Sequence, residues 1–447
     1  MAMEANLPAT PAVSFSLVFS QYELSRRIFM YLPIQDLRRC AQVSRDMNQV
    51  AMITLSDPVR HRSPLVLSWR GPIVSPSTLL KAPLFQSPDH QDMYNEVRTW
   101  TQTIHTEPKV CIAFHSGDFF QIQDDDVTTS ANVTFDKAFK SQFFVDFDRV
   151  DKLLPAHCRS VSMMAPGIVL MDPFSRKPLE IENVDKQTPA LSMVAFPDLS
   201  KCQIVPFNVS EDFQAIKEEL CGPTVRVTPS EIAEMSLKKI TQGQIDDLST
   251  IKGLILLSDG HAIPHSIELI REIAKQTQGR FALGGGLGHL ARCSSEEATQ
   301  DLAALFQSRR WDFVSPGKIT QRTSGLLFAG PNVNVASKIL NQSMRTEKKV
   351  RTALSEFKAS GLNLANAVGF MFACTGRGRG FHRGKKNMES GIFNELYPSV
   401  PLIGIFGNGE IGIDFCSSTH VEPTVPISQS KCVLSYTSVF LVVSFDN

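Results

Sequence analysis

The amino end of the chain has helical periodicity. Between about residues 15 and 53, one apolar stripe contains Leu24, Ile28, Tyr31 and Leu32, and Pro33 interrupts it. Asp36 is a candidate cap for a second helix, whose apolar face consists of Leu37, Cys40, Ala41, Val43, Met47 and Val50. We therefore expect a compact helical hairpin. About forty residues bury little apolar surface alone, so some of it should remain for a partner to cover.

A proline-rich stretch separates these helices from the rest of the chain. Its short apolar runs are broken by Pro58, Pro64, Pro72, Pro76, Pro83 and Pro88. Because proline interrupts both helices and sheet ladders, the pattern predicts strand fragments and linker. We expect the main domain boundary here.

Beyond Lys109 the pattern changes to alternating strands and helices. In residues 252–286, a buried strand is predicted over 253–258, a helix begins at Pro264, and 281–283 starts another strand. This is the spacing of a βαβ unit, which indicates a mixed or parallel sheet covered by helices. Further strands are predicted over 109–114, 189–196 and 201–207, an ambiguous element over 135–148, and a solvated turn at Asp124, Asp125 and Asp126.

The carboxyl end continues the α/β pattern. We expect helices over 346–358 and 388–396, and strands over 367–373, 400–406, 410–415 and 433–445. The predicted fold class is α+β, with a small all-α bundle followed by a larger mixed α/β region. The expected divisions are a helical domain over 15–60, a linker over 61–108, and α/β regions over 109–345 and 346–447.

Composition narrows the classes of function. Lys plus Arg is 45 and Asp plus Glu is 45, so no net charge draws the chain to nucleic acid or to an anionic membrane. The nine cysteines stand singly, without zinc-site spacing, and indicate a reducing compartment. The start of the chain lacks the basic region of a secretory signal, and the apolar tract 433–445 is too short for a membrane span. We expect a cytoplasmic and nuclear protein with no metal and no cofactor.

The amino-terminal helices carry a motif of apolar and polar residues at regular spacing. It consists of Glu23-Leu24, Ile28-Phe29, Tyr31-Leu32-Pro33, Asp36-Leu37-Arg38 and Val43-Ser44. Together these resemble the F-box, the module that docks on the adaptor Skp1 of a ubiquitin ligase. The resemblance implies that Skp1 contacts Leu24, Ile28, Leu32, Pro33 and Leu37. The chain departs from the family at Ser20-Gln21, Ser44 and Met47, which could change the affinity for Skp1. The alternative is an ordinary amphipathic pair that packs on its own chain.

Three blocks near the carboxyl end carry a second motif. They are Gly369–Gly378 (GFMFACTGRG), Tyr397–Gly404 (YPSVPLIG) and Phe406–Gly412 (FGNGEIG). These blocks look like the C-terminal FIST domain, a family that is associated with small-ligand sensing. The resemblance implies pocket candidates: Arg377 for a carboxylate, Asn408 for orientation, Glu410 for an amine, and the neighbouring Cys374.

The glycine-rich loop at 376–380 has a chemical interpretation of its own. It is followed by the basic residues His382, Arg383, Lys385 and Lys386. Flexible backbone amides beside concentrated positive charge suit an anion. Alternatively, the glycines form a turn, the basic residues are solvated, and Asn408-Gly409 is a hairpin turn.

Cys374 could be a reactive thiol. Arg377 and Arg379 are close enough in sequence to stabilise a thiolate, and His382 is the nearest candidate base. The competing interpretation is a cysteine at a strand end, packed as a small apolar residue.

Two other patterns suggest cofactor or metal chemistry only weakly. Gly284, Gly285 and Gly286 follow a strand but lack dinucleotide-loop spacing, so tight backbone packing is the better interpretation. His261 and His265 lie on either side of the expected helix start and have no third ligand nearby, so we expect no metal site.

Two functions from different classes remain. In the first, the F-box-like helices bind Skp1 and through it a cullin-1 and RING ubiquitin ligase, while the α/β region binds a protein substrate for ubiquitination and degradation. Such a chain has no catalytic residues of its own. In the second, the FIST-like region senses a small ligand and the helices only pack internally. A lesser third interpretation is a cysteine-dependent enzyme built on Cys374.

Overall fold

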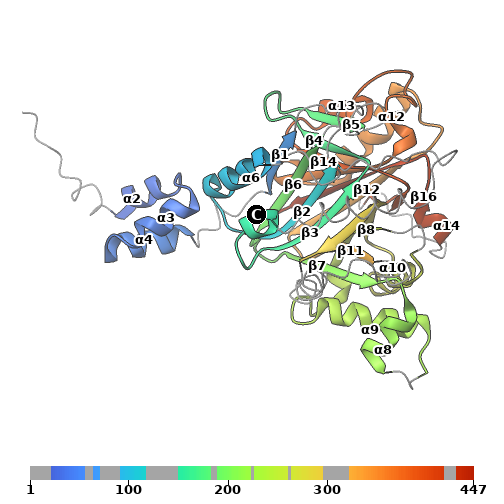
Figure 1. Ribbon diagram of the computed structural model, residues 1–447, viewed down its shortest axis with the longest axis horizontal. Coiled ribbons are helices and arrows are strands. Elements are labelled where there is room, and N and C mark those ends of the chain that lie inside the picture. Colours follow the sequence, from blue (N-terminus) through green and yellow to red (C-terminus); the bar gives the residue numbers. More distant parts are fainter. Residues whose placement is uncertain are drawn as a thin grey trace, which may run out of the picture. The chain divides into compact units, whose positions relative to one another are not determined.

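The computed structural model describes residues 22–55, 64–70, 91–116, 149–182, 189–222, 226–259, 263–294, 322–416 and 429–446. The predicted elements at 124–126 and 135–148 lie outside these residues. The chain divides into a helical unit, residues 1–61 and 99–107, and a larger unit, residues 62–98 and 108–447. Figure 1 shows helices alone at the amino end and mixed strands and helices in the larger unit, which confirms the predicted α+β class.

The helical unit contains three short helices rather than the expected hairpin. They are α2 (Tyr22–Phe29), α3 (Ile34–Cys40) and α4 (Arg45–Leu55). Pro33, not Asp36, precedes α3, because a proline fits a helix start, whereas it lacks the amide hydrogen that continuing the previous helix would need and its ring clashes with the preceding turn. Asp36 lies inside the first turn and pairs with Arg39 at 3.0 Å. The hydroxyl of Ser44 accepts a hydrogen bond from the amide of Met47 at 3.1 Å, where α4 begins.

The helical unit has its own small core. Phe29, Leu37, Val50 and Ala51 are buried in it. A later segment, residues 99–107, completes the unit: the amide of Ile34 donates to the carbonyl of Ile104 at 3.0 Å, and Arg38 pairs with Glu107 at 2.5 Å. The region expected as irregular linker, 61–108, therefore holds ordered elements, the strand β1 (Leu65–Arg70) and the helix α6 (Gln91–Thr103).

Three sheets build the larger unit. The first has the order β1, β6 (Ala190–Pro197), β2 (Pro108–Ser116), β3 (Arg159–Ala165) and β10 (Leu290–Cys293). The second has the order β16 (Val433–Leu434), β15 (Glu410–Ile413), β9 (Ala282–Leu287), β8 (Ile251–Ser258), β11 (Arg322–Ala329) and β7 (Gln203–Ser210). The third has the order β12 (Val333–Leu340), β17 (Ser438–Phe445), β13 (Ala367–Cys374), β14 (Leu402–Gly407), β4 (Gly167–Met171) and β5 (Pro178–Glu182).

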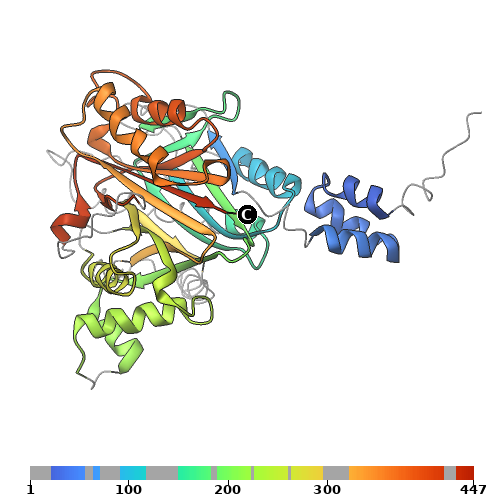
Figure 2. The same cartoon turned by 180° about the vertical axis from the view of Figure 1, so that it is seen from behind.

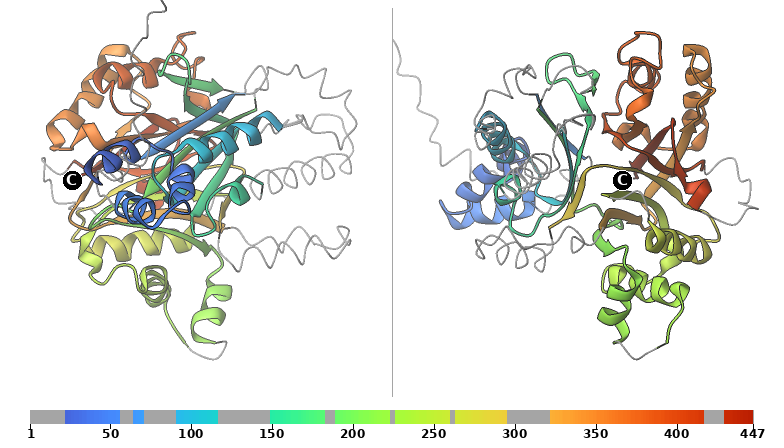
Figure 3. Two further views of the ribbon diagram at one scale, coloured as in Figure 1. Left: turned by 90° about the vertical axis from the view of Figure 1, so that its left-hand side faces the viewer. Right: turned by 45° about the vertical axis from the view of Figure 1, so that its right-hand side comes forward.

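Helices cover the outer faces of the second and third sheets. The second sheet carries α8 (Phe213–Cys221), α9 (Pro229–Thr241) and α10 (Pro264–Gln276), and the third carries α12 (Glu347–Ser355) and α13 (Met388–Leu396). These two groups of helices lie at opposite ends of the larger unit (Figures 1 and 2), and the first sheet lies on the side away from them (Figure 3). Among the described residues, no helix combines the length and the apolar content that a membrane crossing requires.

Successive side chains of a strand point alternately into two different cores. In β13, Phe370 and Phe372 enter a core that all three sheets share, whereas Met371 and Ala373 face α12 and α13. A ring of the first sheet, Phe114, meets Phe372 edge to face at 6.2 Å between centroids. The third sheet thus packs on both of its faces.

The predicted βαβ unit is confirmed. β8 and β9 are parallel neighbours joined by α10, which begins at Pro264. The predicted single last strand over 433–445 is wrong, because the chain changes sheets within it. β16 belongs to the second sheet and β17 to the third, and Tyr436 between them has a left-handed φ of 55°. The third sheet also combines β4, β5 and β12 with strands after residue 346, so the two expected α/β regions share one sheet.

Glycines let the second sheet approach the third closely. A Cβ on Gly284 would lie 3.0 Å from Leu441, and one on Gly286 would lie 2.7 Å from Ile405. Gly253 faces Val335 in the same way, with three side-chain atoms within 2.9 Å. The run Gly284–Gly286 lies within β9, so tight backbone packing, the interpretation favoured from the sequence, is confirmed.

Gly253→Ala should therefore destabilise the larger unit by about 1–3 kcal/mol, since Val335 is branched at the contacted carbon and cannot move aside. Gly391→Ala is the matched control, because its Cβ would meet nothing within 4 Å and alanine favours the helix α13. Thermal unfolding of both variants measures the difference. Equal stability of Gly253→Ala and the wild type would contradict the close packing of the two sheets.

Candidate functional site

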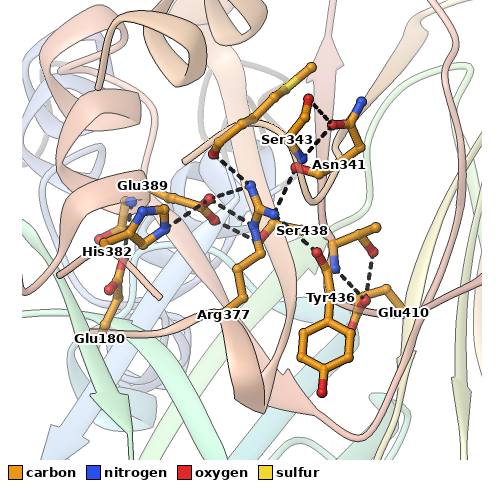
Figure 4. Close-up of polar contacts among 12 residues, drawn as sticks. Glu180, Asn341, Ser343, Arg377, His382, Glu389, Glu410, Tyr436 and Ser438 are labelled. Atoms are coloured by element: carbon orange, nitrogen blue, oxygen red, sulfur yellow. Dashed lines mark hydrogen bonds and ion pairs between the residues drawn. The ribbon is translucent and has the colours of Figure 1, made fainter. Parts of the chain in front are cut away.

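Arg377 lies at the centre of a buried polar network rather than in a ligand pocket. It follows β13 in the short helix η7 (Thr375–Arg377) and is 1% exposed. Its Nε donates to Glu389 at 2.9 Å, and its terminal nitrogens donate to the carbonyl oxygens of Asn341, Tyr436 and Met344 at 2.9, 3.1 and 3.2 Å (Figure 4). The guanidinium that was expected to bind a ligand carboxylate is thus occupied by the chain itself.

Glu389 joins three elements around this arginine. Besides Arg377, its carboxylate accepts from the hydroxyl of Ser438 at 2.5 Å and lies 3.2 Å from Nε2 of His382. Glu389 is at the start of α13 and Ser438 opens β17. His382 is in the loop between η7 and α13, residues 378–387, which we call the basic loop. Charged groups that lose water need counter-charges and hydrogen bonds, and this arrangement provides both. His382, the expected base for Cys374, is instead directed at Glu389 (Figure 4).

Several amides of the basic loop also have acceptors within the chain. The amide of Arg379 donates to both carboxylate oxygens of Glu182 at 2.8 Å. Within the loop, the amide of Phe381 donates to Gly378 at 3.0 Å, and that of Gly384 donates to Arg379 at 2.9 Å. The anion that this loop was expected to bind is therefore supplied by β5. The alternative interpretation, a turn with solvated basic residues, fits the structure better for Arg383, Lys385 and Lys386, which are exposed, but not for His382, which is buried.

Glu410 is the most strongly perturbed of the pocket candidates. It is fully buried in β15 and accepts from the amide of Thr437 at 3.1 Å and from its hydroxyl at 2.6 Å. Burial raises the pKa of Glu410 to about 7, and the bonds from Thr437 and the charge of Arg377 only partly offset this. Near neutral pH, Glu410 can therefore exchange a proton, although it is enclosed.

The half-buried Cys374 lies beside Glu410. Burial raises the pKa of its thiol, and the neighbouring Glu410 charge raises it further. The expectation that Arg377 and Arg379 favour a thiolate is wrong, because the charge of Arg377 is directed at Glu389 and desolvation dominates. The structure supports the competing interpretation of a packed cysteine at a strand end.

Asn408 is exposed and does not join a pocket with Glu410, which is buried two residues later. Its amide donates to the carbonyl of Leu287 at 2.8 Å, and the amide of Leu287 donates to the carbonyl of Gly409 at 2.9 Å. The expected hairpin turn at this position is wrong. β14 and β15 belong to different sheets, so Asn408-Gly409 carries the chain from one sheet to the other.

The expected Skp1 contacts divide into exposed and buried residues. Leu24 and Ile28 on α2 are 40% and 39% exposed, and Leu32 and Pro33 are half-buried. Leu37 is fully buried in the core of the helical unit, so in this structure its side chain offers no surface to a partner. Four other apolar side chains of the unit, none of them an expected contact, are at least 36% exposed: Tyr31, Val43, Met52 and Ile53.

The sequence did not indicate most of the carboxylates that bind Arg377 and the basic loop. Glu389, Glu182 and Glu180 carry no motif, and only the three-dimensional arrangement brings them to the basic loop. Glu180 accepts from the amide of Ser390 at 3.1 Å, and burial raises its pKa to about 7. One sequence signal pointed to part of this arrangement: in the strand β5, Glu180 and Glu182 are two residues apart and therefore lie on the same face.

The weak histidine pattern gains no support. His261 lies outside the described residues, and His265 is buried against Phe213, with a pKa that burial lowers to about 4. Within the described part of the chain, no three His, Cys, Asp or Glu side chains gather in a way that could hold a metal ion.

Comparison with known families identifies the two parts of the chain. Residues 22–56 match the F-box-like family, and residues 291–413 match the FIST C domain family. Each segment thus matches the family that its sequence motif resembles. The FIST C match begins well before the expected boundary at residue 346, in agreement with the sheet that spans this boundary.

Two curated proteins are similar to part of the chain. The chain is similar to F-box only protein 22 of Homo sapiens, with 28% identity over 268 residues, which is 59% of this chain and 58% of the relative. F-box only protein 22 of Pongo abelii gives the same values. The match thus spans less than two thirds of the length of these relatives.

One solved structure covers much of the chain at low similarity. A cyanuric acid hydrolase from A. caulinodans aligns with 86% of this chain and 99% of its own, with 9% identity and a TM-score of 0.27. A similarity of this size says nothing about the fold or activity of the chain.

Arg377→Met should destabilise the protein by about 3–5 kcal/mol, because Glu389 would keep a buried charge without its partner. Adding Glu389→Gln to this variant should restore part of the loss. Arg351→Met is the control, since Arg351 also meets two carboxylates but is 39% exposed, and should cost less than about 1 kcal/mol. Denaturant unfolding measures all three. A loss for Arg377→Met as small as the control's would contradict the central role of the pair.

Glu410→Gln should change the pH dependence of stability. The folded pKa of about 7 exceeds the ordinary 4.5, so the wild type loses stability as the pH rises from about 5 to about 8, and the glutamine variant lacks this loss. The difference in free energy of unfolding, Glu410→Gln minus wild type, should therefore increase by an amount on the order of 2 kcal/mol as the pH rises across this interval.

Glu231→Gln provides a control of opposite sign. Hydrogen bonds from Thr228 lower the pKa of Glu231, so its contribution to stability is lost as the pH falls. Unfolding followed over a pH series distinguishes the two. If the free energies of unfolding of Glu410→Gln and the wild type change with pH in the same way, Glu410 is not held in a protonated state by burial.

Proposed function

We propose that this chain is an F-box adaptor of a ubiquitin ligase. In this proposal the helical unit binds Skp1, and through it cullin-1 and a RING subunit, while the FIST-like unit binds a protein substrate. The F-box-like match and the similarity to F-box only protein 22 support this assignment. The chain itself would contribute no catalytic group, since it acts by holding a substrate near the ubiquitin carrier, which raises their effective concentration.

The observation that supports docking most directly is the exposure of Leu24 and Ile28. Both lie on α2, four residues apart, and so on the same face of the helix. The interior of the unit is filled by its own core, which includes Phe29 and Leu37. Covering exposed leucine and isoleucine side chains yields about 25 cal/mol for each Å² of apolar surface, so a partner that covers this face would bind favourably.

The alternative function, a sensor of a small ligand, has less support. Its expected carboxylate and orientation contacts were Arg377 and Asn408, but the first is paired with Glu389 and the second is exposed on a sheet-to-sheet connection. Only Glu410 retains unusual chemistry, and it is enclosed. A ligase adaptor needs none of these groups to be free.

The test is co-purification of Skp1 with the full chain. Leu24→Asp with Ile28→Asp should abolish co-purification while leaving thermal unfolding unchanged, because both side chains are already partly in water. Phe174→Asp, at a residue 95% exposed on the larger unit, is the matched control and should retain Skp1. Leu37→Asp should lose Skp1 together with the fold of the helical unit. Retention of Skp1 by the folded double variant would refute docking through α2.

A further inference from the structure

A concentration of exposed positive charge surrounds the basic loop. We call it the basic face and define it by Arg345, Lys348, Arg379, Arg383, Lys385 and Lys386, all of which are exposed. Two contacts bring its two segments together. The guanidinium of Arg345 lies 4.6 Å from the centre of the Phe381 ring, and Nζ of Lys385 lies 3.5 Å from Glu347 at the start of α12. In a chain of zero net charge, this face is a local exception.

The structure holds one cation of this face in place before any partner arrives. The ring of Phe381 is contacted by Arg345 and also by the buried Arg377, at 4.7 Å. Arg377 is fixed by Glu389, so the ring forms a firm platform for the exposed guanidinium. Cation–π contact restricts the arginine while leaving its hydrogen-bond donors toward solvent. Less conformational entropy is then lost when an anion binds.

The same face is poorly built for a single phosphate group. A phosphate site usually gathers several backbone amides around one anion. Here the amide of Arg379 is occupied by Glu182, and the amides of Phe381, Gly384 and Lys385 bond to carbonyls within the loop. The exposed cations of the face are distributed over two segments. Such an arrangement matches several negative charges spaced along a chain better than one concentrated anion.

We propose that the basic face binds an acidic protein segment, one in which Asp or Glu side chains are spaced along an extended chain. This inference rests on the proposed function, because the segment would belong to the protein that the adaptor presents for ubiquitination. The partner segment would contain clustered carboxylates and at least one side chain that packs near the half-buried Phe381.

The test is fluorescence anisotropy of the full chain with a labelled peptide of alternating Glu and Ser. We expect saturable binding that weakens at least about tenfold between about 0.05 and 0.5 M NaCl. The matched peptide of alternating Gln and Ser should not bind. Equal binding of the two peptides would overturn the proposal. Tighter binding of a singly phosphorylated Ser peptide or of a single-stranded RNA would also overturn it, since it would assign the face to a different partner.

Variants locate the binding on this face. The triple variant carries Arg345→Glu, Arg383→Glu and Lys386→Glu. Its affinity for the Glu peptide should be lower by at least about tenfold, which corresponds to about 1.4 kcal/mol. The control reverses three exposed cations outside the basic face, Lys109→Glu with Lys201→Glu and Arg280→Glu, and should change affinity less than about twofold. If the triple variant does not fold, Arg345→Gln alone should still weaken binding. Unchanged affinity in the folded variants would refute the proposal.

The experiments distinguish a failure of the adaptor proposal from a failure of the acidic-segment proposal. Peptide binding needs no Skp1, and the variants of the basic face should co-purify with Skp1 as the wild type does. Loss of Skp1 binding with intact peptide binding would refute the adaptor function alone. Retained Skp1 binding without peptide binding would refute only the acidic partner.

Discussion

The larger unit depends on one buried ion pair, Arg377 with Glu389. The arginine ties η7 to the carbonyl oxygens before α12 and before β17, and the glutamate ties α13 to Ser438 and His382. A buried pair of this kind adds little net stability compared with well-packed apolar residues, but it tolerates no loss of either partner. Its value lies in specificity, because only one arrangement of these four segments satisfies all its hydrogen bonds.

This pair also decides what the adjacent surface can do. Because Arg377 is used internally and Glu182 occupies the amide of Arg379, the basic loop is a rigid support and not a closed pocket for a small anion. The same support holds Phe381 and, on it, Arg345. A binding function of this region therefore belongs to exposed side chains, which suits a protein partner. The helical unit is organised in a comparable way, with a closed core around Leu37 and apolar residues left outside it.

Sequence reasoning succeeded where a local pattern is sufficient. The βαβ unit around Pro264 and the helix α13 follow from periodicity, and the close packing of Gly284–Gly286 follows from residue size. It failed where the decisive partner is remote. Leu37 has the same apolar character as Leu24, and only the positions of α4 and α2 decide which is buried. Arg377 could not be assigned without Glu389, because a guanidinium in a glycine loop is equally suited to a ligand or to its own chain.

Hydrogen exchange of the backbone amides in residues 378–387 tests this account most directly. The amides of Arg379, Phe381 and Gly384 have internal acceptors, so in the wild type they should exchange slowly, comparably with amides of α13. In Arg377→Met the same amides should exchange quickly, since the loop loses its buried attachment. Fast exchange of these amides in the wild type would show that the loop is not held by Arg377 and Glu389, and would contradict the account.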